Sequence, residues 1–244
     1  MKKTSKTVIF FGSGPVAAKS LELLANDFEV EAVVTKPRAP NHKGAVPVIA
    51  LTEELGIPTY TANSKQELDT LFLDKPFRSD LAILIDFGII VSQEVIDYFP
   101  LGIVNSHFSI LPEWRGADPI TFAILSGQKK TGVSLMLVVE KMDEGPLIGY
   151  GEYDLSDTET TPGLTDGLIK LSHGLLLHEI PRRTSPTPGV PQSITGRDVS
   201  YSRKLTKADG IIDWSKSATE IEREIRAFIG WPGSHTTLGT KDVI

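Results

Sequence analysis

Residues 101–120, LGIVNSHFSILPEWRGADPI, contain the point at which a predicted core strand gives way to polar residues. The apolar residues Ile103 and Val104 are followed by Asn105 and His107, where a strand inside a core would continue with apolar side chains. A strand that ends in Asn-x-His is more typical of a functional site than of a core. We therefore take the end of this strand as the centre of the candidate site.

A helix and a second strand follow. Pro and Gly bracket an apolar segment at residues 119–127, which predicts a short helix. Residues 133–139 are almost continuously apolar, as in a strand buried on both faces, and they lead into the polar run KMDEG, which contains Asp143. Two strands joined through a helix normally lie parallel in a right-handed crossover, so their ends emerge at one edge of the sheet. This topology predicts that Asp143 meets Asn105 and His107.

The run NSHFSILPEWRG and the later MDEG resemble the signature of the folate-dependent formyltransferases, an Asn-x-His-x-Ser-Leu-Leu-Pro segment with a later Asp-x-Gly turn. Enzymes of this family move a formyl group from 10-formyltetrahydrofolate to an amine. The resemblance implies catalytic positions for Asn105, His107 and Asp143. It also implies that the adjoining loop lines the folate pocket, with the residues Ser109, Ile110, Leu111 and Pro112. Here Ile110 replaces the first Leu of the family pattern, and Phe108 stands where the family more often has Gly or Pro.

These residue types meet the needs of the reaction. An amine that attacks a formyl carbon builds negative charge on the carbonyl oxygen and positive charge on its own nitrogen. Asn105 offers a neutral hydrogen-bond donor to the oxyanion. The imidazole of His107 can donate to the oxyanion or shuttle the proton. The Asp143 carboxylate can orient the imidazole and accept the amine proton directly or through water. The chemistry requires no metal and no covalent intermediate.

The chain as a whole predicts an α/β fold with a Rossmann-like, twisted and mainly parallel sheet. Strands are expected at residues 7–12, 31–35, 81–85 and 149–155, and helices at residues 15–25, 48–55, 66–73, 93–98 and 161–180.

A glycine-rich turn at residues 12–17, GSGPVA, follows the first strand and matches the dinucleotide-binding pattern G-x-G-x-x-A. It supports a different class of function, a nicotinamide-dependent oxidoreductase. That fingerprint also expects an acidic residue at the end of the second strand, where this chain has Thr35 and Lys36. Close packing of strand and helix explains the glycines without a cofactor, so the oxidoreductase is the weaker alternative.

Two more segments acquire roles through the resemblance. In the family, the turn after the strand at residues 81–85 lines the folate pocket, which makes Phe87, Gly88 and Ile89 pocket candidates; a plain strand-to-helix corner explains them equally well.

The second such segment is the basic loop at residues 36–46, KPRAPNHKGAV. It occupies the place from which the transfer-RNA-acting members of the family reach the acceptor stem. The resemblance therefore makes Lys36, Arg38 and Lys43 candidates for contacts with phosphates, in an interaction that salt weakens. The alternative is an ordinary solvated surface loop.

Composition limits the class of protein. The 244 residues fit one large domain or one domain plus part of another, and 40% hydrophobic residues suffice for a core. No apolar stretch is long enough to span a membrane, and the start of the chain does not resemble a secretory signal. The absence of Cys excludes thiolate chemistry and disulfides and favours the cytoplasm. A net charge of -6 argues against indiscriminate nucleic-acid binding, so any RNA contact must be local.

The end of the chain indicates which branch of the family it resembles. GIIDWS at residues 210–215 and IRAFIGWPG at residues 225–233 resemble the domain junction of the members that act on initiator methionyl-tRNA. A late helix is expected there, with Ile221, Ile225 and Phe228 facing inward. We predict a catalytic domain at residues 1–183, a Pro-, Ser-, Thr- and Gly-rich linker at 184–205 and, at 206–244, the incomplete beginning of an OB-like, transfer-RNA-binding barrel. A barrel cut short cannot close its core, so residues after Pro232 are expected to pack loosely.

The resemblance thus implies formyl transfer from 10-formyltetrahydrofolate to the α-amine of methionine on initiator transfer RNA, with tetrahydrofolate as product. The closest rival is a sugar-nucleotide amine formyltransferase, which shares the catalytic pattern and the donor; residues 225–233 speak against it. A non-catalytic relative that only binds folate or RNA is weaker, because all three catalytic positions are filled.

Overall fold

The fold is built around a seven-stranded sheet with strand order β3-β2-β1-β4-β5-β7-β8. The computed structural model of the protein describes residues 6–38, 44, 46–74, 77–238 and 241–243. The strands of the sheet are β1 (Thr7–Phe11), β2 (Glu29–Thr35), β3 (Thr59–Thr61), β4 (Ala82–Leu84), β5 (Ile103–His107), β7 (Lys130–Leu137) and β8 (Leu147–Asp154). The α-helices are α1 (Pro15–Asp27), α2 (Pro47–Leu55), α3 (Lys65–Asp74), α4 (Gln93–Asp97), α5 (Pro119–Ser126), α6 (Thr161–Glu179) and α7 (Ala218–Ala227).

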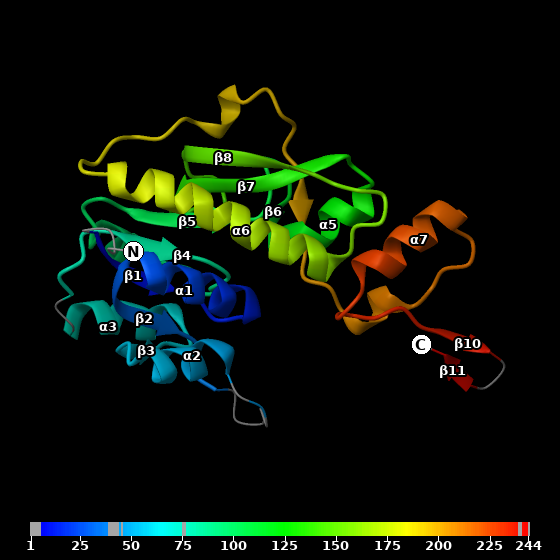
Figure 1. The fold of residues 1–244 in the computed structure, drawn as a ribbon, viewed down its shortest axis with the longest axis horizontal. Coiled ribbons are helices and arrows are strands. Elements are labelled where there is room, and N and C mark those ends of the chain that lie inside the picture. The colour runs from blue at the N-terminus through cyan, green and yellow to red at the C-terminus, as the bar shows by residue number, and fades with distance from the viewer. Residues whose placement is uncertain (1–5, 39–43, 45, 75–76, 239–240, 244) are drawn as a thin grey trace.

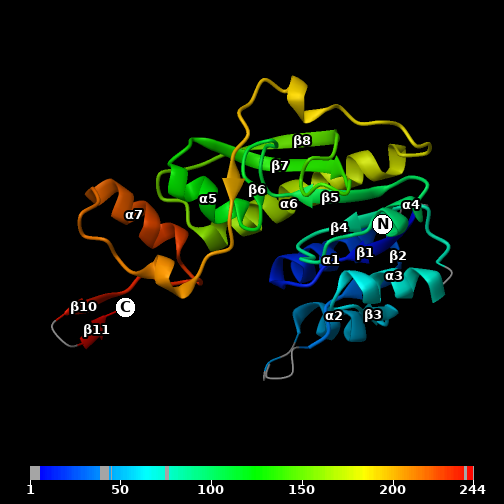
Figure 2. The same ribbon diagram turned by 180° about the vertical axis from the view of Figure 1, so that it is seen from behind.

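Helices cover both faces of the sheet, as the alternation of side chains along β1 illustrates. Phe10 belongs to the core cluster that includes α1 and α6, whereas Phe11 packs with the aromatic residues Phe72 and Phe99 on the other face. Successive side chains of a strand point to opposite faces, so one apolar run serves two cores. Figure 1 shows α1 and α6 in front of the sheet, and Figure 2 shows α3 and α4 from behind. The predicted Rossmann-like α/β fold is confirmed.

The strands from β3 to β5 are parallel, as predicted, but β5 and β7 are antiparallel, with His107 opposite Ser134 and Val104 opposite Leu137. The predicted parallel crossover between these two strands is therefore wrong. The connecting helix α5 packs against α6 and α7 and does not return along the sheet. Because the chain stays beyond the carboxyl end of β5, it enters β7 from that end and runs back.

The first turn of α5 shows why the chain bends there. Asp118 caps the helix by accepting a hydrogen bond from the Thr121 amide, Pro119 occupies the first helical position, and Gly127 ends the helix with φ of 70°. These local signals set the length of the helix, which at eight residues is too short to cross back over the strands it connects.

After α6, residues 184–205 run along the edge of the sheet beside β8 and then past β6 (Arg115–Gly116), as Figure 1 shows. There β9 (Tyr201–Ser202) pairs with β6 in a separate two-stranded sheet, visible from behind in Figure 2. Short 3-10 turns lie at Ile180–Arg182, Gln192–Ile194 and Lys207–Gly210.

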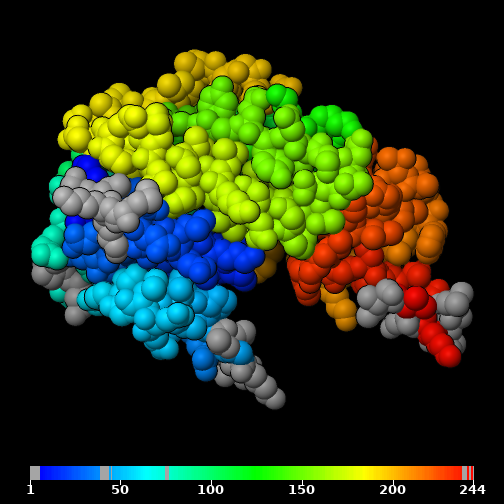
Figure 3. Space-filling model, viewed as in Figure 1, coloured from blue at the N-terminus to red at the C-terminus, as the bar shows by residue number. Residues whose placement is uncertain are grey.

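The C-terminal segment projects from one end of the molecule (Figure 3). Helix α7 is capped by Ser217 and Glu220 and buries Ala227 and Phe228, but Ile225 is 46% exposed, so its predicted inward orientation is wrong. The reason is that α7 packs mainly on α5, which covers only one side of it. Strands β10 (Thr236–Leu238) and β11 (Lys241–Val243) form an antiparallel hairpin, and the described residues close no barrel. None of the described helices is long and apolar enough to cross a membrane.

Candidate active site

Asn105 and His107 lie two residues apart on β5, so their side chains point to the same face of the sheet. Ser106, between them, faces the opposite way and pairs its hydroxyl with Ser172 of α6 at 2.7 Å. The candidate site therefore lies on the face of β5 that α6 does not cover. His107 is buried and Asn105 is half-buried.

Asp143 reaches this face through the loop between β7 and β8. Val138, at the start of that loop, continues the ladder with β5, since its amide donates to the carbonyl of Ile103. Gly145 permits the close return: a Cβ atom there would lie 1.7 Å from the carbonyl oxygen of Leu137. Asp143 itself has φ of 54°, in the left-handed region. The expected meeting of Asp143 with the Asn105–His107 face occurs, but through a folded-back loop and not through parallel strands.

The Asp143 carboxylate links the elements of the site. One oxygen, Oδ1, lies 3.7 Å from His107 Nδ1 and 3.5 Å from the amide nitrogen of Asn105. The other, Oδ2, accepts a hydrogen bond of 2.8 Å from the backbone N–H of Gly116 on β6. Because Asp143 is only 8% exposed, these contacts act with little competition from water.

The tautomer of His107 follows from its second contact. Its Nε2 lies 2.9 Å from the carbonyl oxygen of Trp114, and a carbonyl can only accept, so Nε2 carries a proton. In the neutral ring, the lone pair is then on Nδ1, the nitrogen that faces Asp143. Trp114 has φ of 54° and is held in place by bonds from its amide to Ser200 and from its indole to Gln128.

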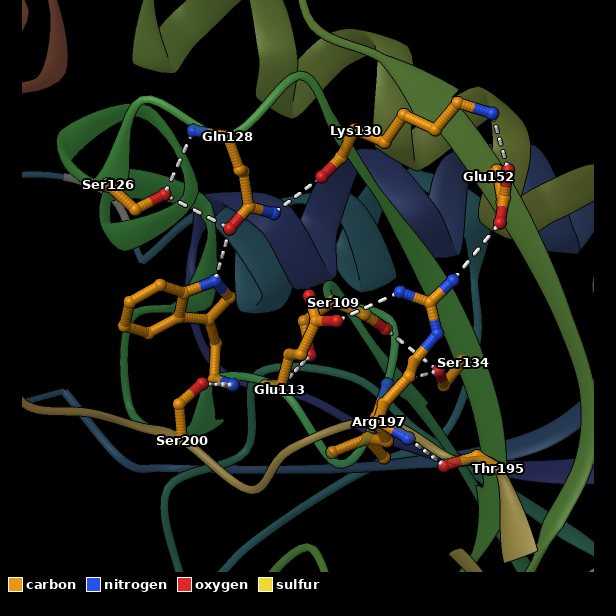
Figure 4. A network of polar contacts seen from close by, with 12 residues as sticks. Ser109, Glu113, Ser126, Gln128, Lys130, Ser134, Glu152, Thr195, Arg197 and Ser200 are labelled. Atoms are coloured by element: carbon orange, nitrogen blue, oxygen red, sulfur yellow. Dashed lines mark hydrogen bonds and ion pairs between the residues drawn. The ribbon is translucent and has the colours of Figure 1, made fainter.

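The loop after His107 is fixed from below by Ser134 of β7. The Ser134 hydroxyl accepts from the Leu111 amide at 2.9 Å and donates to the Ser109 carbonyl at 2.8 Å. Figure 4 shows this contact together with Arg197, which bridges Glu113 and Glu152. The four predicted pocket residues of this loop, all of them buried in the protein, are Ser109, Ile110, Leu111 and Pro112.

The second predicted part of the folate pocket is the turn after β4. Phe87 is buried and packs edge-on against Phe11, while Gly88, with φ of 65°, is exposed and Ile89 is half-buried. Phe87 thus supports the turn from inside the core. The solvent-facing parts of the turn are the backbone of Gly88 and the side chain of Ile89. Lys36 lies beside this turn: a Cβ atom at Gly88 would come within 3.1 Å of its Nζ.

Asp86 is a feature of this turn that sequence reasoning missed. A Cβ atom at Gly14 would lie 2.0 Å from Asp86 Oδ2, so this carboxylate stands over the glycine-rich turn at the N-terminus of α1. Although the residue as a whole is exposed, burial of the carboxyl group raises the pKa of Asp86 to about 6, with Lys36 opposing and Asp118 adding to the shift. Burial also raises the pKa of Asp118.

The other residues proposed for RNA contact lie at the start of the loop after β2. Arg38 is exposed, and Lys43 lies outside the described residues. Lys36 lies beside Asp86 and beside Gly88, which is one of the folate-pocket candidates. A role in phosphate binding alone does not predict this position.

Sequence reasoning also gave the 184–205 segment no role in the site. In the structure, Gln192 of this segment is buried and bonds to the backbone of the Asp143 turn, and Ser200 holds Trp114. The one sequence signal for this role is a single polar residue, Gln192, in a Pro- and Ser-rich stretch. One such residue does not identify a functional position. Within the described part of the chain, no group of three or more His, Asp or Glu side chains could hold a metal ion.

Comparisons with known proteins agree with this fold. Residues 6–180 match the family model described as formyl transferase, and residues 204–244 match the formyl transferase C-terminal domain. The chain belongs to the formyltransferase family, whose members are one-carbon group transferases.

Two relatives within this family are named methionyl-tRNA formyltransferase. The protein from Magnetococcus marinus is 34% identical over 238 residues, which cover 96% of this chain and 76% of the relative. The protein from Nitratidesulfovibrio vulgaris strain DP4 is 36% identical over 248 residues, covering 97% and 74% of the two chains.

Solved structures show the same fold. An N-formyltransferase from Helicobacter canadensis, in complex with folinic acid and dTDP-3-aminofucose, superposes with a TM-score of 0.71 at 21% identity, covering 98% of this chain and 86% of that one. Phosphoribosylglycinamide formyltransferase from Bacillus halodurans gives a TM-score of 0.60 at 25% identity over 72% of this chain and 94% of that one.

Proposed function

We propose that this chain transfers the formyl group of 10-formyltetrahydrofolate to the α-amine of methionine on initiator transfer RNA. The names of the relatives and the FIGWPG segment at residues 228–233 support this acceptor. Translation initiation is cytoplasmic, so the proposal includes that location. It also keeps the division into a catalytic domain at 1–183, a connection at 184–205 and a transfer-RNA-binding part from 206.

Asn105, His107 and Asp143 perform the chemistry in this proposal, and the observation that carries it is the buried Asp143 carboxylate within 3.7 Å of both partners. The amine nitrogen bonds to the formyl carbon, and the carbonyl oxygen becomes an oxyanion that the Asn105 amide stabilises. The bond between that carbon and the folate nitrogen then breaks, which restores the carbonyl.

Proton transfer accompanies both steps. His107 Nε2 is committed to the Trp114 carbonyl, so only Nδ1 can exchange a proton with the reactants. The amine loses its proton to Asp143 or, through it, to His107 Nδ1, and the departing folate nitrogen receives one. The folate-pocket candidates, which complete the proposed donor site, lie in the turn after β4 and in the 109–112 loop that directly follows His107.

The oxidoreductase alternative loses support at the glycine-rich turn. A helix N-terminus attracts a phosphate because its N–H groups and dipole are positive. Here the Asp86 carboxylate already stands over Gly14, so a pyrophosphate would meet a like charge. The sugar-nucleotide alternative remains the second candidate, since the fold is shared with enzymes of that kind.

Two measurements on the purified chain test the proposal. With 10-formyltetrahydrofolate as donor, formylation is measured on charged initiator methionyl-tRNA and, separately, on amino-sugar nucleotides. Asp143→Asn is expected to leave folate binding nearly unchanged and to slow transfer by about two or more orders of magnitude. Formylation of the sugar alone would replace the acceptor, and unchanged turnover in Asp143→Asn would remove that residue from the mechanism.

A further inference from the structure

Gln192 is a buried polar residue whose amide is fully committed. It is 5% exposed, and its Nε2 donates to the carbonyl oxygens of Asp143 and Gly145, each at 2.8 Å. Its Oε1 accepts two hydrogen bonds from the Arg115 guanidinium, at 2.7 Å and 3.2 Å. A guanidinium can only donate, so Arg115 dictates which end of the amide faces it and directs the N–H groups to the turn.

The turn that Gln192 holds is the one that needs support. Asp143 has φ of 54°, in the left-handed region that residues with a side chain uncommonly adopt. Its carbonyl is engaged by Gln192, and so is the carbonyl of Gly145 two residues on. Together these bonds clamp both ends of the turn and oppose its rotation to a relaxed conformation, which would carry the carboxylate away from His107.

Arg115 and its neighbour Gly116 on β6 hold the Asp143 turn at two more points. Arg115 Nη1 lies 3.5 Å from Glu144, the residue between the two clamped carbonyls. Gly116, next to Arg115 on β6, binds the Asp143 side chain through its N–H. The backbone of the turn is thus held by Gln192 and its side chain by Gly116, and β9 of the 184–205 segment pairs with the strand that carries Arg115 and Gly116.

We propose that Gln192 is a positioning residue for formyl transfer, which holds the Asp143 turn so that the carboxylate stays beside His107. This inference rests on the proposed function of Asp143. It also gives the 184–205 segment a role in catalysis, because removing one amide from that segment disturbs a carboxylate 49 residues earlier in the chain.

The test compares Gln192→Met, which has similar length but no donor, with the wild-type protein. We expect kcat for formyl transfer to fall about 10- to 100-fold, since displacement of a reacting group by about 1 Å costs that much. The KM for the folate donor should stay within about twofold. Gln93→Met, at an exposed position of α4, is the matched control and should keep wild-type kcat. Thermal melts identify a loss that comes from unfolding; if Gln192→Met is unfolded at the assay temperature, Gln192→Glu, which retains the pair with Arg115, replaces it.

A double-mutant cycle separates positioning from general stabilisation. In an Asp143→Asn background, the Gln192 substitution should slow transfer less than about twofold further, because its effect passes through the Asp143 carboxylate. Equal losses in both backgrounds, or wild-type kcat in the single Gln192 variant, would overturn the inference alone. Full activity of Asp143→Asn would overturn the proposed mechanism and this inference with it.

Discussion

Replacing Asp86 by Asn should stabilise the protein at neutral pH. The Asp86 carboxyl group is buried over the Gly14 turn, which raises its pKa to about 6; Lys36 offsets part of this effect and the nearby Asp118 strengthens it. At pH 7 the group is ionised in the folded protein in spite of an unfavourable environment. Asn removes that charge while keeping the shape of the side chain.

The sign and size of the effect follow from linkage. Between about pH 4 and pH 6 the folded protein holds the Asp86 proton more tightly than the unfolded chain does, so this group lowers the free energy of unfolding as pH rises through that window. A shift from 3.8 to about 6 corresponds to a ceiling of about 3 kcal/mol. The residue is exposed, and solvent screening reduces the expected gain from Asp86→Asn to about 1 kcal/mol above pH 7.

Denaturant unfolding from pH 4 to pH 8 provides the measurement. The stability difference between Asp86→Asn and the wild-type protein should be greatest above pH 7 and should shrink as the pH falls toward 4, where the wild-type carboxyl group is protonated in the folded protein and partly protonated in the unfolded chain. Asp198→Asn, at an exposed position, controls for the general effect of removing a negative charge. A difference that is absent at pH 8, or that does not change with pH, would refute the reasoning.

Three further outcomes are expected. In Gly145→Ala the new Cβ would meet the Leu137 carbonyl at 1.7 Å, so the free energy of unfolding should fall by about 2 kcal/mol and the rate of formyl transfer more than tenfold. Melting measures the first effect and kinetics the second. Ser106→Ala should cost about 1–2 kcal/mol of unfolding free energy by leaving the buried Ser172 hydroxyl unpaired, and the double Ala variant should cost less than the sum of the two single variants. On the proposed function, Arg38→Ala should weaken the binding of different transfer-RNA sequences equally. It should also lower the slope of log binding constant against log salt concentration by about 1.

Each of these has a contrary outcome. Wild-type stability of Gly145→Ala would contradict the close return of the loop; Gly174→Ala, in open space on α6, is its control. Additive losses at Ser106 and Ser172 would mean that their hydroxyl contact contributes nothing. An unchanged salt slope in the Arg38 variant would show that this residue meets no phosphate.

The residues proposed to be catalytic on β5 could be read from the sequence because the information is local. An apolar run that ends in Asn-x-His places both polar side chains on one face of a strand, whatever the rest of the chain does. The parallel half of the sheet and the helices around it follow from the same kind of periodicity, since each element needs an apolar side for the core. The resemblance to the family signature then made Asp143 a candidate, which periodicity alone cannot do.

The direction of β7 could not be predicted from local sequence, because that direction depends on where α5 packs. That helix docks on α6 and α7 beyond the end of β5, so the chain reverses and Asp143 arrives on a folded-back loop. Sequence patterns describe each element by itself, whereas docking depends on helices that lie far along the chain.

The sequence by itself determined the fold class, the Asn105–His107 pair and the residues of the family signature, because these depend on short-range pattern. Only the tertiary structure decided which nitrogen of His107 can exchange a proton with the reactants and what holds Asp143 in its left-handed turn. The Trp114 carbonyl and the Gln192 amide provide those answers: Ser200 of the 184–205 segment holds Trp114, and Gln192 belongs to the same segment. Hydrogen bonds between distant segments have no period along the chain, and this is why no reading of the sequence could find them.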